Sequence, residues 1–159
     1  MQSLTLRLTL TLLFVLPIVS GWGPCGPITG GRIAGELATE LVNDWTFTDD
    51  ISTIQIETRP DDPYSVTTWC FTDGPHLYIP SRGAPTKPWV KNVLADPRVR
   101  LRIGGKVYAM RATRVTDDGQ RGKLIALLKK KYVTARWGMD DDPEASPDTW
   151  FFHVEQEQF

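Results

Sequence analysis

Cysteine and histidine are scarce in this chain of 159 residues, which contains two of each. The two cysteines lack the Cys-x-x-Cys spacing of a closed zinc site, so no metal centre is expected. An excess of positive charge is also missing, because 18 Lys and Arg stand against 19 Asp and Glu, for a net charge of −1. Without a basic field the chain is not expected to bind nucleic acid.

Internal repeats are absent as well, and the composition excludes disordered, collagenous and polytopic membrane proteins. Hydrophobic residues make up 41% of the chain and charged residues 23%, which are ordinary values for a globular protein. A chain of this length is enough for one hydrophobic core, so we expect a single folded domain.

The one long apolar run is at the N-terminus, where 12 residues follow Arg7, the first charge in the chain. The run is shorter than the roughly 20 residues that span a bilayer, and small residues follow it, which is typical of a signal peptide. Residues 1–24 are therefore predicted to be a signal peptide or membrane anchor. We expect an exported protein of the cell envelope, either membrane-anchored through its N-terminus or periplasmic.

Cys25 occupies the position at which a bacterial lipoprotein carries its lipidated cysteine, although Pro24 departs from the usual small residue before it. Lipidation of Cys25 and an ordinary cleaved signal with Cys25 in a free tail are the two alternatives. Residues 25–50 are rich in Gly and lack any sustained period, so we expect a tether and strap whose Trp45 and Phe47 lie on the domain or in its core.

Alternating apolar and polar residues, with Gly and Pro between them, predict a mostly β domain over residues 51–159. Two segments have helical spacing instead and are bounded by helix-start and helix-stop residues. The expected strands are 51–58, 64–72, 76–80, 98–103, 106–115 and 149–155, and the expected helices are 87–96 and 120–132. This order predicts a six- to seven-stranded antiparallel barrel with two short helices.

The clearest hairpin turns at Gly104-Gly105, since two glycines suit a tight two-residue turn. That turn places Ile103 opposite Lys106, and it gives the hairpin one apolar face. The other face carries four arginines, which must be solvated, paired with acids of a second subunit, or part of an anionic ligand site. These are Arg98, Arg100, Arg102 and Arg111.

Two stretches carry a family resemblance: Leu77-Tyr-Ile-Pro-Ser81, and residues 87–101, which include Trp-Val-Lys-Asn-Val-Leu-Ala-Asp-Pro-Arg-Val. Together they resemble the signature of the split-barrel flavin-binding superfamily, that of pyridoxamine 5'-phosphate oxidase and the deazaflavin-dependent reductases. The resemblance covers roughly residues 51–155. It implies a split β-barrel, FMN or a deazaflavin as cofactor, a small-molecule substrate, and a homodimer with the cofactor cleft between subunits.

The same resemblance implies the cofactor-binding residues. Ser81 and Lys87 would hold the cofactor phosphate with Arg82 and Thr86 beside them, since a strand end that opens into a helix N-terminus offers donors and a cation to a phosphate. Strand residues 67–70, which include Thr68 and Trp69, would lie along the flavin ring. Ordinary loop roles for these residues are the alternative.

No catalytic side chain is assigned. Cys70 lies in a β-rich apolar run and is expected to be a buried, unreactive thiol. His76 and His153 are far apart in sequence and lack a nucleophile motif, so no catalytic triad is predicted. The acidic run 140–142 lacks calcium-loop spacing and is expected to be a solvated loop.

These observations favour a flavin- or deazaflavin-binding oxidoreductase of the cell envelope that acts on a small organic acceptor. The alternative is a non-catalytic envelope lipoprotein that uses the split barrel as a binding or interaction module.

Overall fold

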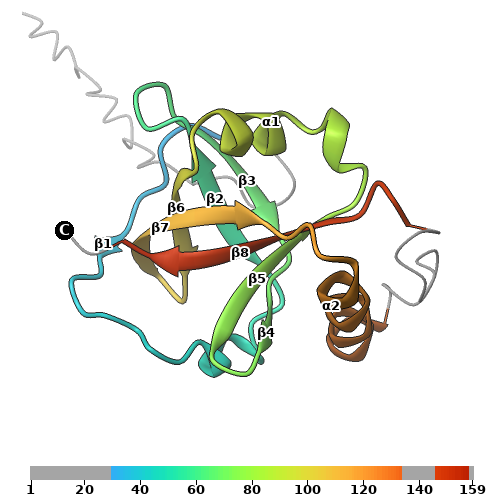
Figure 1. Ribbon diagram of the computed structural model, residues 1–159. Helices are drawn as coiled ribbons and strands as arrows, with labels where there is room; N and C mark the ends of the chain where they lie inside the picture. Colours follow the sequence, from blue (N-terminus) through green and yellow to red (C-terminus); the bar gives the residue numbers. More distant parts are fainter. Residues whose placement is uncertain (1–29, 134–145, 158–159) are drawn as a thin grey trace, which may run out of the picture.

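The structure is a computed structural model that describes residues 30–133 and 146–157. A curled sheet dominates it, with one helix at the end of the curl and one helix against its outer face (Figure 1). The strands are β1 (Glu36–Leu37), β2 (Ile54–Thr58), β3 (Tyr64–Thr68), β4 (Phe71–Asp73), β5 (His76–Ser81), β6 (Arg98–Ile103), β7 (Lys106–Arg114) and β8 (Trp150–Gln156). The helices are α1 (Pro88–Ala95) and α2 (Asp118–Lys131), with short 3-10 turns η1 (Thr46–Thr48) and η2 (Ala84–Thr86).

The sheet has the strand order β3-β2-β6-β7-β8-β5-β4, and every pairing along this path is antiparallel. The strands at its two ends, β3 and β4, are consecutive in the chain. The sheet therefore curls until its ends are joined only by Trp69 and Cys70, which is the arrangement of a split barrel. The predicted fold is confirmed.

Two hydrophobic cores lie on opposite faces of the sheet. The inner core fills the barrel and is closed at one end by Trp89, Val90 and Val93 of α1. The outer core lies between the sheet and α2, where Leu124 and Leu128 pack against Phe71, Tyr78 and Phe151. Each strand of the β5–β8 pair thus contributes alternate residues to the two cores, as period-two alternation requires.

The hairpin β6–β7 has the predicted register, with Leu101 opposite Tyr108 and Ile103 opposite Lys106. Gly104 and Gly105 form its turn with φ of 57° and 90°, a left-handed conformation that side-chain-bearing residues rarely adopt. Gly35 in the strap packs on this turn, and a Cβ there would stand 2.9 Å from the carbonyl oxygen of Gly105. The glycine lets β1 pair in parallel with the start of β7.

The arginine-bearing face is largely solvated, as one of the alternatives from the sequence expects, and three of its arginines also pair with acids of the same chain, which no alternative included. Arg98 contacts Asp96 at 2.6 Å and Arg111 contacts Glu157 at 2.8 Å. Arg100 contacts the Glu57 carboxylate at 3.2 Å. The partners of Arg100 and Arg111 are 43 and 46 residues away in sequence, so these pairs depend on the tertiary fold.

Several predicted boundaries are wrong. The predicted strand 64–72 is two strands, because the chain leaves β2 after Thr68 and joins β5 from Phe71 onward. This break and the two-residue β1 raise the strand number to eight. In the strap, Trp45 is buried against Tyr108, whereas Phe47 is 49% exposed.

Helix α2 begins two residues before the predicted start, because Asp117 caps it by accepting a hydrogen bond from the Gln120 amide at 2.7 Å, and it ends in the three lysines that the sequence predicts. Neither α1 nor α2 is long and apolar enough to cross a bilayer, nor is any other helix within residues 30–133 and 146–157. The predicted signal segment 1–24, Cys25 and the acidic run 140–142 lie outside the described residues.

Candidate functional site

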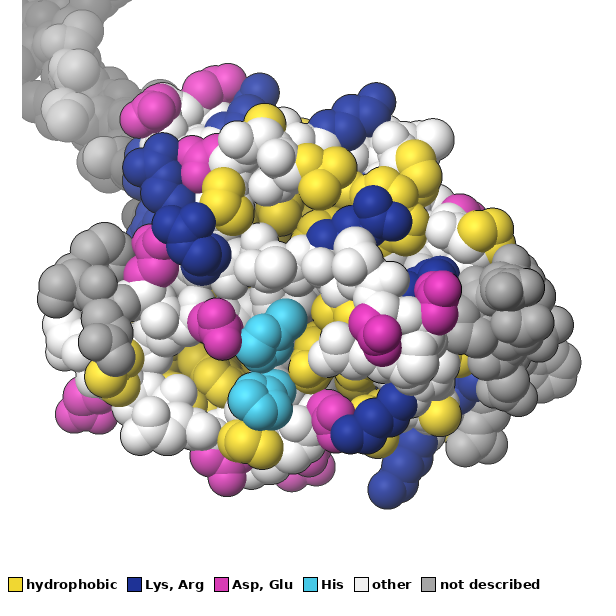
Figure 2. Space-filling view, viewed as in Figure 1, with side chains coloured by type: hydrophobic (Ala, Val, Ile, Leu, Met, Phe, Trp, Pro, Cys, Tyr) yellow, Lys and Arg dark blue, Asp and Glu magenta, His cyan; other side chains and the backbone are white. Residues whose placement is uncertain are grey.

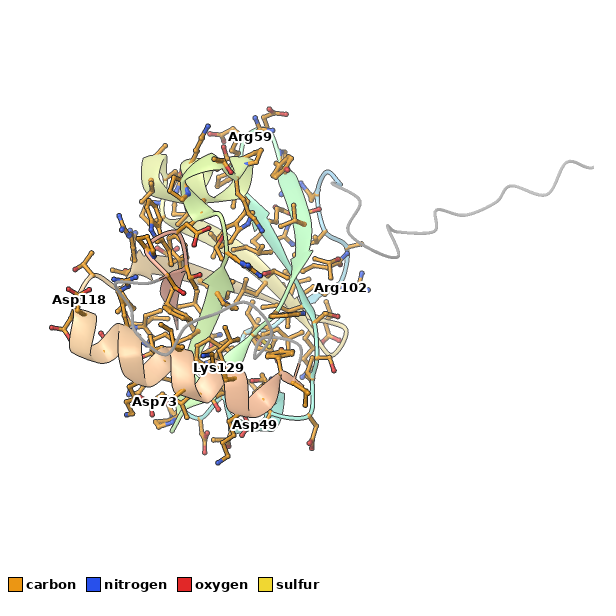
Figure 3. The ribbon with its side chains drawn as sticks, turned by 90° about the vertical axis from the view of Figure 1, so that its right-hand side faces the viewer. Asp49, Arg59, Asp73, Arg102, Asp118 and Lys129 are labelled. Carbon is orange, nitrogen blue, oxygen red and sulfur yellow. The ribbon has the colours of Figure 1, made fainter. Side chains whose placement is uncertain are left out.

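The split of the barrel lies between β3 and the second half of β5. Strand β3 pairs with β2 on one side, and β5 pairs with β4 only through His76–Tyr78, so Ile79 to Ser81 have a strand neighbour on the β8 side alone among the described strands. Figure 3 looks at this side of the molecule, with α2 along its lower part, where Asp118 labels the start of the helix. The residues that the sequence predicted for one site lie on, or directly after, the two strands that border this split.

On the β3 side, backbone groups face the split. Gly30 exchanges two hydrogen bonds with Ser65, from Ser65 N–H to the Gly30 carbonyl at 2.7 Å and from Gly30 N–H to the Ser65 carbonyl at 2.9 Å. Ser65 thus directs its polar backbone groups away from β2. Because these directions alternate along an antiparallel ladder, Thr67 directs its N–H and carbonyl to the same outer edge. Thr68, predicted to line the ring, is the half-buried last residue of β3.

Trp69 and Cys70, which connect β3 to β4, are fixed by Tyr132 at the end of α2. The Trp69 and Tyr132 rings stack at 4.5 Å with an interplanar angle of 8°. The Tyr132 hydroxyl accepts a hydrogen bond from the Cys70 N–H at 3.2 Å and lies 2.7 Å from the carbonyl oxygens of Cys70 and Ser52. Burial raises the pKa of the Tyr132 hydroxyl, which stays protonated. One face of the Trp69 indole is therefore already occupied.

Cys70 is completely buried, as the sequence predicts. Burial raises the pKa of its thiol, although the nearby Lys131 ammonium partly opposes that effect. The thiolate needed for nucleophilic chemistry is disfavoured, and the thiol is a structural element of the strand connection.

On the β5 side, Ser81 ends the strand and is only 2% exposed. Its hydroxyl oxygen is buried and makes no hydrogen bond within the described structure. Nearly all buried polar groups in folded proteins are hydrogen-bonded, so an unpartnered hydroxyl marks a place where a further group can bind. The donor chemistry of Ser81 and of the cations beside it fits a phosphate.

The loop that follows Ser81 is compact and carries two free cations. Gly83 adopts φ 66°, which allows the chain to turn into η2, and the Ala84 N–H donates to the Asp148 carbonyl at 3.0 Å. Arg82 and Lys87 are exposed, and neither has an acidic partner in the described part of the chain. This arrangement brings the two cations of the predicted site to the same edge of the split as Ser81.

Thr86 differs from its predicted neighbours in the phosphate site. Its hydroxyl donates to the Gly83 carbonyl at 3.0 Å, and its N–H contacts the same oxygen at 3.2 Å. The threonine therefore uses its proton inside the loop. Lys87 is the residue before the first turn of α1, where Pro88 removes one of the free N–H groups but later first-turn N–H groups remain.

Two features of the structure could not be predicted from the sequence. Arg114, at the end of β7, lies with its guanidinium carbon 3.4 Å from the ring centroid of Trp150, the first residue of β8 and the partner of Ser81 in the ladder. This contact depends on the pairing of β7 with β8, whose partners are far apart in sequence.

His76 and His153 come together as well, with ring centroids 5.3 Å apart, and Figure 2 shows them side by side on the surface. Burial lowers the pKa of His153, and the neighbouring His76 adds to this while Glu155 opposes it. No group of three Cys, His, Asp or Glu side chains in residues 30–133 and 146–157 could hold a metal ion. The two histidines lie on β5 and β8, on the outer face of the sheet and at the opposite end of β5 from Ser81.

Residues 68–141 match the family model of the F420H2-dependent quinone reductases. A search of curated proteins found no match. Among solved structures, a candidate pyridoxamine 5'-phosphate oxidase of Listeria innocua aligns at 20% identity over 67% of this chain and 85% of its own, with a TM-score of 0.52. An F420H2-dependent reductase aligns at 19% identity over 66% and 95% (TM-score 0.50), and an FAD-binding protein of Mesorhizobium loti at 18% over 69% and 84% (TM-score 0.50).

The strand order and these likenesses define the class: the chain has the fold of the split-barrel superfamily that includes flavin- and deazaflavin-dependent proteins. Within that superfamily, the matched region resembles the F420H2-dependent quinone reductases. The match contains Trp69, Ser81 and the loop to Lys87, which are the residues that form the two sides of the split.

Proposed function

We propose that this protein binds FMN or a deazaflavin in the split of the barrel and passes a hydride or electrons to a small, quinone-like organic acceptor. The buried, unpartnered hydroxyl of Ser81, beside two exposed cations, is the observation that carries the proposal. The similarity of residues 68–141 to F420H2-dependent quinone reductases supports the class of cofactor and acceptor.

Ser81, Arg82 and Lys87 would hold the phosphate of the cofactor. Lys87 supplies a charge-assisted contact, and Ser81 supplies a neutral one after rotation about a single side-chain torsion. Thr86 would shape this loop through its bonds to Gly83 rather than donate to the ligand. Across the split, the Thr67 N–H and carbonyl would meet the polar edge of the ring, with Thr68 and Trp69 beside it.

The bound flavin or deazaflavin would supply the redox chemistry. The chain itself would position the ring and keep water from it, which are the usual contributions of a protein to cofactor chemistry. No side chain of the described split has the position and protonation behaviour of an obligatory acid or base: Cys70 is a buried thiol and Tyr132 is held protonated. We therefore assign no catalytic residue.

Titration of FMN and of F420 into the purified protein tests the proposal, with ring absorbance and thermal stabilisation as readouts. Lys87→Ala should weaken binding by about 1.5 to 3 kcal/mol, or roughly ten- to more than hundred-fold. Lys123→Ala removes an exposed lysine of α2, away from the split and from the proposed dimer surfaces, and serves as the matched control. If the wild type binds neither cofactor, the redox function is wrong, and the alternative, a non-catalytic envelope module, takes its place.

We also propose that the protein acts in the cell envelope, on the strength of the apolar run after Arg7 and the position of Cys25. Cys25→Ser should then change N-terminal processing and release the protein from the membrane fraction. If the variant fractionates like the wild type, the lipid anchor is wrong, and simple secretion or an uncleaved membrane anchor remains.

A homodimer is the last part of the proposal, and the surfaces that we assign to it are the Arg98–Arg111 hairpin or the edge strand β3. Exposed strand edges of a small sheet favour pairing with a second copy. Light scattering on the chain beginning at residue 26 tests this at micromolar concentrations. A monomer would argue against a cofactor site shared between subunits.

A further inference from the structure

Arg114 and Trp150 lie on the same face and at the same end of the barrel as Ser81. Ser81 is opposite Trp150 in the β5–β8 ladder, and Arg114 is opposite Phe152, two residues further along β8. Residues two apart on a strand share a face, so all three side chains project to the inner face where the barrel meets the phosphate loop. Two strand spacings together with this offset of two residues place the Cα atoms of Arg114 and Ser81 about 12 Å apart, a gap that a long arginine side chain and a phosphate group can span together.

The guanidinium of Arg114 is held in a defined orientation. It stacks 3.4 Å from the Trp150 ring centroid, and the indole N–H donates to the Pro147 carbonyl at 3.1 Å, which fixes the ring. Trp150 also packs against the inner core. A stacked guanidinium keeps its N–H groups in the plane parallel to the indole, where they can form two bonds to one oxyanion.

The positive charge of Arg114 is not matched by an acid. Arg98, Arg100 and Arg111 each pair with a carboxylate, whereas no carboxylate in the described parts of the chain pairs with Arg114. Burial and then the nearby Arg121, which itself pairs with Asp118 at 2.7 Å, lower the pKa of Arg114. An exposed guanidinium that is held in one orientation and has no acid partner is a favourable site for an anion.

We infer that Arg114, held on Trp150, is an additional binding residue for the phosphate group of the cofactor. The identity of the ligand rests on the proposed function, whereas the anion-binding property belongs to these two side chains. Arg114 would face the phosphate from the β7 side, and Lys87 and Arg82 would face it from the loop after β5. Trp150 acts as a positioning residue, since it orients Arg114.

The first measurement compares FMN with riboflavin, which has the same ring and lacks the phosphate. Arg114→Gln should weaken FMN binding ten-fold or more, as expected for loss of a charge-assisted bidentate contact, and should change riboflavin binding less than two-fold. Arg114→Lys should restore only part of the loss, because an ammonium keeps the charge but cannot form the planar fork. Lys123→Gln, which removes an exposed cation of α2 that pairs with Asp73, is the matched control and should leave both affinities unchanged.

The second measurement needs no flavin. Pyrophosphate, titrated at constant ionic strength into the full chain, should change tryptophan fluorescence to saturation. Trp150→Phe should remove most of that signal, and Arg114→Gln should raise the half-saturating concentration at least ten-fold. A purely structural stack would lower the melting temperature of both variants without altering either titration.

The outcomes separate the two proposals. Equal discrimination between FMN and riboflavin in wild type and Arg114→Gln overturns the role of Arg114 and leaves the proposed function intact. A pyrophosphate response that depends on Arg114, without binding of FMN or F420, supports the anion site and overturns the proposed function. A wild type that neither responds to pyrophosphate nor prefers FMN overturns the anion site.

Discussion

On the closed side of the barrel, three arginines of the hairpin β6–β7 pair with acids of the same chain, whereas the cations beside the split between β3 and β5 have no acid partner in the described residues. Arginines of the hairpin face meet Asp96, Glu57 and Glu157. At the split, the Ser81 hydroxyl has no partner, and Arg82, Lys87 and Arg114 have no acid in the described structure. A buried polar group without a partner costs stability, so the Ser81 hydroxyl and the unpaired cations near it are the features on which the proposed binding site depends.

The largest effect should come from the core of the closed side. Leu101 is fully buried between Ile56 and Tyr108 of the neighbouring strands. Leu101→Ala should lower the free energy of unfolding by about 2 to 5 kcal/mol, because it leaves a cavity in the inner core. Urea denaturation gives the value, and Leu94→Ala, at a side chain that is 55% exposed, should stay within about 0.5 kcal/mol. Equal losses at both positions would contradict this assignment of the core.

A smaller effect should follow from the ion pairs of the arginine-bearing face. Glu57 is 2% exposed, and its carboxylate accepts from the Ile33 N–H at 2.5 Å and from Arg100. Glu57→Ala should cost about 1.5 to 3 kcal/mol, since buried donors lose a charged acceptor. Arg111→Gln breaks a more exposed pair and should cost less than about 1 kcal/mol in the same unfolding measurement. A face that is merely solvated would show no difference between the two variants.

Ser81→Ala tests the split side directly, because stability and binding should change in opposite directions. Removing a buried hydroxyl without a partner should raise the free energy of unfolding by about 1 kcal/mol, while FMN affinity should fall roughly two- to twelve-fold. Thr86→Ala is the control in the same loop, and it should lower stability because the Thr86 hydroxyl is bonded to Gly83. A loss of stability in Ser81→Ala would mean that the hydroxyl is already bonded in the folded protein.

The smallest effect concerns the histidine pair on β5 and β8. Burial lowers the pKa of His153, and Tyr78, His76 and Glu155 are the titratable groups that face it. The folded state therefore disfavours the imidazolium, so the contribution of His153 is fully present above its unfolded pKa of about 6.5 and decreases as the pH falls below that value. Urea unfolding at pH 7.5 and pH 5.5 should show a larger loss in wild type than in His153→Gln. Parallel losses in the two proteins would exclude this contribution.

Local patterns were sufficient to predict most of the fold. The Gly104-Gly105 turn determined the hairpin register, and the Pro88 start and the terminal lysines delimited the two helices. The break at Trp69 and Cys70 was missed, because the residues 64–72 have continuous strand propensity and only the pairing of β4 with β5 interrupts them.

The predicted site was less accessible to sequence reasoning. The family resemblance pointed to Ser81, Arg82, Thr86 and Lys87, and the structure brings these to one loop at the edge of the split. It did not indicate that Ser81 is buried, since that burial arises from the pairing of β5 with β8. Arg114 and Trp150 had no local signal, because their contact arises from the register of β7 on β8.

The connection through Trp69 and Cys70 has a mechanical consequence. Those two residues join the ends of the sheet, and Tyr132 clamps them by a ring stack and by hydrogen bonds to both backbone polar groups of Cys70. The two walls of the split cannot swing apart about so short and restrained a connection, as two domains do about a hinge. Entry and exit of a planar ligand should therefore follow side-chain rotations on the picosecond-to-nanosecond scale rather than microsecond-to-millisecond hinge opening.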